Sequence, residues 1–169
     1  MGGEIRLYSA ISELEHGPAF HTPGTGRILI LSLREDGFIS LKTKDPELES
    51  NVATREKIWH GGNLHVNIKA RRATLAIYST MSENQDMNIL GHAEPIEGFS
   101  HSDCVEFSGD STDWVPEFKS GRRLDELVGR TLVFEVKFTD GEIFSLSGDY
   151  TDIFNVEGAV YRRYGVLRL

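Results

Sequence analysis

The 169-residue chain has almost no cysteine, little proline and no long apolar run. Cys104 is its only cysteine, so the chain cannot form an internal disulfide. No apolar stretch approaches the roughly 20 residues that cross a bilayer as a helix. The N-terminus lacks the basic-then-apolar pattern of a secretion signal. These absences argue against a disulfide scaffold and a membrane partner, and they leave the cellular location open.

Clustered positive charge is also missing. The chain carries 26 acidic and 18 basic residues, a formal net charge of −8. Proteins that bind nucleic acid need Lys and Arg gathered against the phosphates. The two basic pairs, Arg71-Arg72 and Arg122-Arg123, stand beside turn-forming residues, which predicts solvated loop tips. We therefore expect no nucleic-acid partner.

Short strand-like segments are frequent, some alternating apolar with polar side chains and others forming short apolar runs, and both patterns predict strands. They lie at residues 5–11, 27–33, 38–41, 64–68, 74–79, 132–138 and 142–146. Asp36-Gly37 and Asp140-Gly141 separate neighbouring segments and predict hairpin turns, because glycine accepts the positive φ of such turns. Residues 69–73 predict a connection, and residues 123–129 predict the one helical turn.

Many short strands with regularly spaced turns predict an all-β fold. We expect one domain over residues 1–169, an antiparallel two-sheet β-sandwich of the jelly-roll, concanavalin-like type. A chain of this length buries enough surface to need no disulfide or metal for stability.

Four motifs follow one another along the chain. They are R-x-D-G-F-x-S-L from Arg34, G-G-x-L-x-V-N from Gly61, G-F-S-x-x-D-C-x-x-x-x-G-D-S from Gly98, and L-x-x-L-x-G from Leu124. Together they resemble the C-terminal β-sandwich (jelly-roll) module of five-bladed β-propeller glycosidase-like proteins. The resemblance covers residues 27–146 and implies a jelly roll associated with glycan-processing proteins.

The resemblance implies no active site in this chain, because catalysis in such proteins belongs to the propeller. A propeller does not fit within this length. Residues 5–33 would correspond to the last propeller strand and its lead-in. Residues 147–169 extend beyond the pattern, and we expect an extra strand there that pairs with residues 5–11 or with a neighbouring chain.

Two sequence features resemble nucleophile sites, but each is better explained as structure. Gly109-Asp110-Ser111 is similar to a serine-esterase block, yet all six histidines precede Ser111, and the tripeptide suits a turn. Cys104 follows His101 by three residues, a spacing that places them on opposite faces of a strand, so Cys104 is expected in the core. With 26 acidic residues, chance pairs are inevitable. We expect no catalytic residues, and a small glycosidase or esterase is a distant alternative.

Metal ligands form no motif either. His60 and His65 flank Gly61-Gly62 without a third ligand. Oxygen atoms of four acids would suit a calcium ion, although no D-x-D-x-D-G loop is present. These acids are Asp103, Glu106, Asp110 and Asp113. We expect no cofactor and no metal, with structural Ca²⁺ as the open alternative.

Sugar binding uses aromatic faces beside polar groups. The candidates are Trp59, Tyr78, Asp113, Trp114 and Glu117. In a strand, Trp114 would share a face with Phe118, and Asp113 and Glu117 would share the other. If Phe118 is core, Trp114 leans toward the core rim, and Trp59 presents the same alternative.

The sequence thus predicts a non-catalytic carbohydrate-associated module that binds glycan weakly and is accessory to a glycoside hydrolase domain. The alternative is an interaction domain in which the N-terminal strand and the C-terminal tail form a homo-oligomer.

Overall fold

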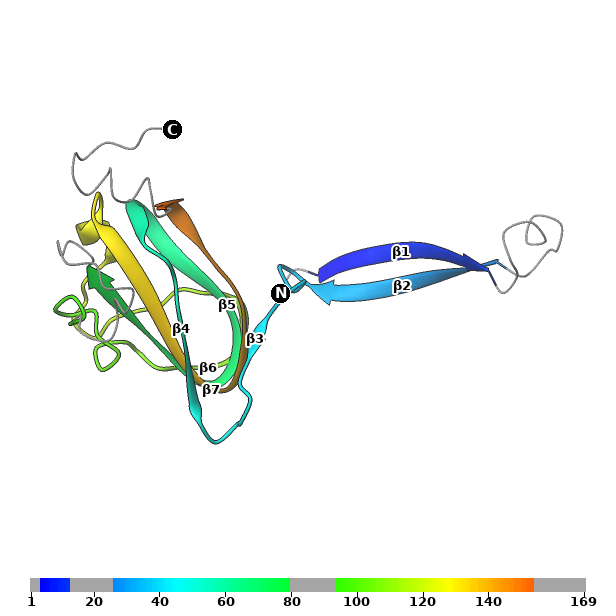
Figure 1. Ribbon diagram of the computed structural model, residues 1–169, viewed down its shortest axis with the longest axis horizontal. Helices are drawn as coiled ribbons and strands as arrows, with labels where there is room; N and C mark the ends of the chain where they lie inside the picture. The colour runs from blue at the N-terminus through cyan, green and yellow to red at the C-terminus, as the bar shows by residue number, and fades with distance from the viewer. Residues whose placement is uncertain (1–3, 13–25, 80–93, 154–169) are drawn as a thin grey trace. The chain divides into compact units, whose positions relative to one another are not determined.

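The computed structural model describes residues 4–12, 26–79 and 94–153. These residues form two units, which divide the chain at residues 39 and 40 (Figure 1). Almost all the regular structure is β-strand, and paired strands run antiparallel in each sheet. The all-β, antiparallel prediction is therefore confirmed. Within the described residues, no helix has the length and apolar character needed to cross a membrane.

The first unit contains a β-hairpin of two nine-residue strands. They are β1, Glu4–Ser12, and β2, Gly26–Arg34. The pairing is continuous from Glu4 with Arg34 to Ser12 with Gly26, with Tyr8 opposite Ile30 at the centre. The expected extra strand of the C-terminal segment was to pair with residues 5–11 or with a neighbouring chain. Residues 147–152 instead pair with residues 57–65. The rest of that segment, residues 154–169, lies outside the described part, and the expectation stays a prediction there.

The predicted turn at Asp36-Gly37 exists, but it does not close a hairpin. The Gly37 amide donates to the Arg34 carbonyl at 2.9 Å, and Asp36 has a φ of 54°. The strands on either side have different partners: β2 pairs with β1, whereas Leu41–Lys42 after the turn pairs with residues 142–143. The turn chemistry was predictable, whereas the choice of partner depends on residues far away in the chain.

Two long strands, paired side by side, carry the second unit. They are β5, Lys57–Ser79, and β7, Thr131–Asp152. The two strands run in opposite directions, and their pairing extends from Trp59 with Tyr150 to Ser79 with Leu132. Shorter strands complete the order β3-β7-β5-β6, with β4 also on β7. These are β3 (Leu41–Lys42), β4 (Glu49–Ala53) and β6 (Phe107–Trp114).

This sheet curves until it closes on itself at the start of β5. Lys57 pairs with Leu132 near the beginning of β7 and with Asp152 at its end, and the neighbouring Ile58 repeats the pattern. The Lys57 ammonium also forms an ion pair with Asp152 and lies 4.0 Å from the ring centroid of Tyr150. Since one point on β5 contacts both ends of β7, β7 must bend strongly along its length, as Figure 1 shows.

The bend explains why two predicted turns are wrong. Residues 69–73 lie inside β5, and Asp140-Gly141 lies inside β7. Asp140 has a φ of 46°, and Gly141 lies opposite Ala70. A Cβ on Gly141 would be 2.6 Å from the Lys69 carbonyl oxygen and 2.7 Å from Ala70 Cβ. The Asp-Gly pair therefore bends a continuous strand and lets its partner approach closely.

The loop-tip prediction for Arg71-Arg72 is wrong for the same reason, because both residues belong to β5. Their side chains are exposed and approach acids of other segments. Arg71 lies 3.7 Å from Glu47, and Arg72 lies 3.8 Å from Glu49. Exposed pairs at these distances contribute little to stability.

The helical-turn prediction is confirmed as a short 3₁₀-helix, η1, Leu124–Leu127. Leu124 and Leu127 face the core, and Gly129 follows with a φ of 79°. A positive φ after the last turn is the usual reason for glycine at a helix end.

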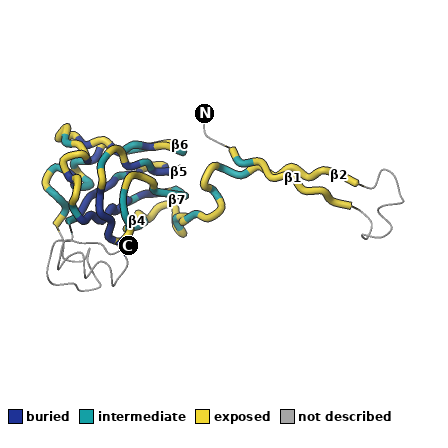
Figure 2. The backbone as a smooth tube through the Cα atoms, turned by 90° about the horizontal axis from the view of Figure 1, so that it is seen from above, coloured by how far each residue is buried: buried dark blue, intermediate teal, exposed yellow. Residues whose placement is uncertain are grey.

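The core lies in the second unit, where Figure 2 shows the buried stretches of the backbone. Every second residue of the first part of β7, from Leu132 to Phe138, and of the end of β5, from Ala73 to Ile77, points into it, as strand alternation requires. Its largest fully buried side chains are Trp59, Phe99, Phe134, Leu64, Ile68, Leu75 and Ile77. Cys104 is buried among them, as predicted, and its sulfur accepts a hydrogen bond from the Leu75 amide at 3.3 Å.

We predict that Gly141→Ala lowers the free energy of unfolding by about 1–3 kcal/mol, the usual cost of forcing a methyl group into a packed contact. Gly26→Ala is the control, because no atom lies within 4 Å of a Cβ there. Denaturant titration measures both variants. Equal stability of the two would contradict the close approach of β5 and β7 at the bend.

Candidate functional site

The second and fourth sequence motifs meet in space. Gly61 and Gly62 have φ values of 126° and 78°. The Gly62 amide donates to the Asp125 carboxylate of η1 at 2.9 Å. The Gly129 amide donates to the Trp59 carbonyl at 2.8 Å. Residues more than 60 positions apart thus form one corner of the second unit.

The third motif builds a turn and part of the core. Gly98 has a φ of 81°, and the buried Phe99 ring packs edge-on to Phe118 with centroids 4.8 Å apart. Asp103 accepts hydrogen bonds from the Ser100 hydroxyl at 2.6 Å and the Ser100 amide at 3.1 Å. These bonds hold the pKa of the Asp103 carboxyl below its usual value. The motif residues therefore act structurally.

The block Gly109-Asp110-Ser111 is not a turn, so that prediction is wrong. It lies within β6, where Asp110 pairs with Lys69 and Ser111 pairs with Ile68. The Ser111 hydroxyl accepts a hydrogen bond from the Asp113 amide at 3.0 Å. The strand uses this serine for a local contact rather than presenting it at a sharp elbow.

The aromatic sugar-binding candidates have no free face. Trp59 is fully buried, edge-on to Phe134 at 5.6 Å between centroids. Tyr78 is buried, and its hydroxyl donates to Glu135 at 2.7 Å. Trp114 is 9% exposed and stacks on Phe107 at 4.9 Å. A sugar could reach these rings only by displacing core contacts.

The two acidic candidates lie in different places. Asp113 is exposed on β6 and bonds His65 Nδ1 at 2.5 Å. Glu117 is exposed and lines a pocket. The structure therefore does not gather the five candidates into one site.

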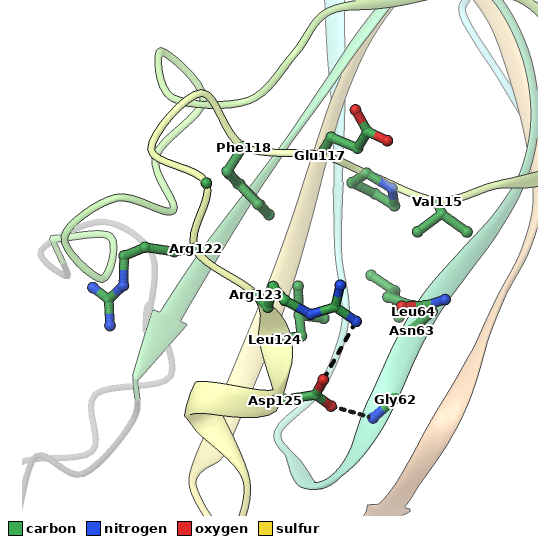
Figure 3. A pocket seen from close by; sticks show the side chains of 12 residues that line it. Gly62, Asn63, Leu64, Val115, Glu117, Phe118, Arg122, Arg123, Leu124 and Asp125 are labelled. Carbon is green, nitrogen blue, oxygen red and sulfur yellow. Dashed lines mark hydrogen bonds and ion pairs between the residues drawn. The ribbon is translucent and has the colours of Figure 1, made fainter.

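The pocket has a volume of about 400 Å³ and lies at the corner where the second and fourth motifs meet (Figure 3). Its polar lining comes from Asn63, Glu117, Arg123 and Asp125. Arg123 lies 3.5 Å from Asp125, which also holds the Gly62 amide. The buried residues Leu64, Phe118 and Leu124 contribute its apolar lining. The arrangement offers donors and acceptors to a small polar molecule but no exposed aromatic ring.

A buried polar cluster lies on the opposite face of the sheet from the core. Glu135 is 5% exposed. Its carboxylate accepts from Asn51 at 3.0 Å, from the Tyr78 hydroxyl at 2.7 Å and from His101 Nε2 at 3.1 Å. His101 Nδ1 lies 3.0 Å from the Thr74 hydroxyl. The cluster joins β4, β5, β7 and the turn of the third motif.

The ionisation of this cluster follows from its contacts. Burial pushes the pKa of Glu135 up, but the hydrogen bonds from Asn51, His101 and Tyr78 outweigh it and leave the pKa below its usual value. Burial and the neighbouring Glu135 raise the pKa of Tyr78. At neutral pH, Glu135 is therefore charged and fully hydrogen-bonded, which suits a structural tie.

Sequence alternation alone could not find this cluster. In Phe134-Glu135-Val136, the glutamate occupies a position that alternation assigns to the outer face. The residue does lie on that face. Its burial depends on Tyr78 and His101, which come from elsewhere in the chain.

The four acids considered for calcium have separate partners. Asp103 bonds Ser100, and Asp113 bonds His65. Asp110 lies 3.8 Å from Lys69, and Glu106 lies 3.7 Å from Arg72. Across residues 4–12, 26–79 and 94–153, no group of three or more His, Cys, Asp or Glu residues is arranged to hold a metal ion.

We predict that Asp125→Ala destabilises the second unit by about 1 kcal/mol, because the Gly62 amide loses its acceptor. Asp125→Asn keeps an acceptor oxygen and should stay close to the wild type. Thermal unfolding of both proteins measures the difference. An equal loss in both would show that charge, rather than the hydrogen bond, matters at this corner.

We predict that Glu135→Gln lowers the free energy of unfolding at pH 7 by roughly 1–3 kcal/mol. The substitution should also make the free energy of unfolding depend less on pH in the acidic range. A carboxyl whose pKa is lowered by folding adds stability above its unfolded pKa, near 4.5, and loses it as pH falls through the lower folded value. The wild type should therefore lose more stability than Glu135→Gln below about pH 4.5. Glu106→Gln, at an exposed acid, is the control, and parallel pH profiles for wild type and Glu135→Gln would contradict the assignment.

Comparison of the chain with protein families, with curated proteins and with solved structures found no match in any of the three. What the chain does must therefore be argued from its own residues.

Proposed function

We propose that the chain is a non-catalytic interaction domain whose binding element is the hairpin β1–β2. One observation carries the proposal. Seven large apolar side chains of this hairpin are between 41% and 74% exposed. They are Leu7, Tyr8, Ile11, Ile28, Leu29, Ile30 and Leu31.

These side chains occupy both faces of the hairpin. In the observed register, Leu7 lies opposite Leu31 on one face, and Tyr8 lies opposite Ile30 on the other. Figure 2 shows that both strands are exposed along most of their length. Single exposed apolar residues are normal on proteins, but a contiguous group of this size marks an interaction site.

A two-stranded sheet also needs a partner for its own stability. An isolated hairpin is marginally stable in water, and three or more strands or a packed face are required to stabilise it. The second unit has its own buried core. The hairpin is thus the part of the described chain that gains most from binding another surface.

The second candidate function is the carbohydrate-associated module predicted from the motifs. The polar pocket favours it, because Glu117 lies there beside Asn63 and Arg123. The motifs and the curved sheet also support a jelly-roll fold for the second unit. In this candidate function, the second unit is accessory to a glycoside hydrolase domain. This candidate needs the pocket, whereas the interaction proposal needs only the hairpin.

Hydrogen exchange tests the interaction proposal. In dilute protein, we predict protection factors below about 10 for the amides of β1 and β2, because the lone hairpin opens easily. The amides of β5 and β7 should exchange far more slowly. On assembly with a partner, the hairpin amides become protected. Strong protection of the hairpin in a monomer at every concentration would contradict the proposal, since the hairpin would then pack on its own chain.

A glycan panel tests the second candidate. If the pocket binds sugar, at least one glycan should give a saturable heat of binding in titration calorimetry, lost in Glu117→Ala, which alters the pocket lining, and kept in Glu106→Ala. Silence across the panel would remove carbohydrate binding and leave the interaction proposal unaffected.

A further inference from the structure

The outer edge of β2 is unusually open for a native strand. One edge of β2 pairs with β1 along all nine residues without a bulge. Among the described residues, no strand pairs with its other edge. The six residues Ile28–Leu33 carry no charge and no proline. Native proteins normally protect such an edge with a lysine, a proline or a bulge, because it recruits further strands.

The outer edge of β1 is less apolar. Each strand carries two charged side chains and a run of six uncharged residues. In β1 this run, residues 7–12, includes two serines and an alanine, whereas five of the six residues Ile28–Leu33 are Leu or Ile. Large apolar side chains that face each other across neighbouring strands stabilise a sheet. Of the two edges of the hairpin, β2 is therefore the one suited to accept another strand.

We propose that the outer edge of β2 pairs with the same edge of a second copy of this chain, antiparallel and centred on Ile30. The inference rests on the proposed function and names its partner. The two hairpins then form one four-stranded sheet, which exceeds the number of strands that a sheet needs for independent stability.

The sequence of β2 is complementary to itself in this register. Leu29 of one copy lies opposite Leu31 of the other, and Ile28 lies opposite Ser32. Arg27 faces Leu33, and Arg34 faces Gly26, so no two arginines oppose each other. Parallel in-register pairing would instead place like charges directly opposite, which is destabilising. The charge pattern therefore selects the antiparallel arrangement.

Symmetry favours a second copy over an unrelated strand. Antiparallel pairing of one strand with itself has a two-fold axis, the commonest symmetry of homo-oligomers. This axis is perpendicular to the sheet, so the Leu29 and Leu31 side chains of both copies lie on one face and touch across the seam. The exposed apolar residues of two hairpins thus become neighbours, and each shields the other from water.

Cysteine cross-linking tests the register. Cys104 is 1% exposed, so the wild type offers no accessible thiol among the described residues. In Ile30→Cys, the two new thiols would face each other across the axis, with Cβ atoms about 4.5–5.5 Å apart, close to disulfide geometry. Mild oxidation should then yield a covalent dimer. Ile28→Cys is the matched control, because its two thiols would be roughly 13 Å apart along the strands.

A mixture supplies a second, independent readout. Neither Ile28→Cys nor Ser32→Cys should cross-link alone, but an equimolar mixture of both should give the mixed dimer, identified by its mass. Tyr8→Cys reports on the edge of β1. Cross-links at 30 and in the mixture, without cross-links at 28 or 8 alone, support the inference.

Three results would overturn the inference. They are dominant cross-linking through Tyr8→Cys, equal cross-linking at all positions, and absence of cross-links in both Ile30→Cys and the mixture at every concentration. If no cross-links form and hydrogen exchange still shows unprotected hairpin amides, the proposed function stands but its partner is not a second copy. If the hairpin amides are protected in a monomer, both the inference and the proposed function are contradicted.

Discussion

The exposed apolar residues of β1 and β2 need a second surface, because two strands cannot cover their own faces. The same problem is solved within the second unit by curvature. There β5 and β7 bend together until Lys57 and Ile58 contact both ends of β7, which encloses Trp59, Phe134 and the other core side chains. Among the described residues, the hairpin does not bend back on itself to enclose its apolar side chains. The contrast between a closed sheet and an open one is the basis for assigning binding to the first unit.

Local sequence patterns predicted which residues form strands better than they predicted where strands end. Strand-like alternation and apolar runs located β1, β2 and both halves of β5 and β7, and the spacing of Leu124 and Leu127 located η1. Asp140-Gly141 was misjudged, because the same dihedral freedom serves a hairpin turn and a bend within a strand. Only the partner decides between them, here Ala70 opposite Gly141. That contact lies about 70 positions away and leaves no local signal.

The candidate site was predicted less well than the fold. Trp59 and Tyr78 have the residue types of a sugar platform, but their rings are buried. Aromatic side chains serve cores and binding faces equally, so type and local pattern cannot separate the two roles. Glu117 alone of the five candidates lines the pocket. Glu135 was missed because its partners come from distant segments. The exposed residues of the hairpin were visible as apolar runs, and alternation places such a run on both faces of a strand. Their exposure became visible only in the structure.

Side-chain footprinting of the hairpin by hydroxyl radicals tests the central claim most directly. The account predicts that Tyr8, Ile28 and Ile30 are modified readily in dilute protein and become protected as the concentration rises, while Trp59 is protected throughout. If the three hairpin residues were as protected as Trp59 at the lowest concentration, the hairpin would already be buried by its own chain. Its role as a binding element would then be contradicted.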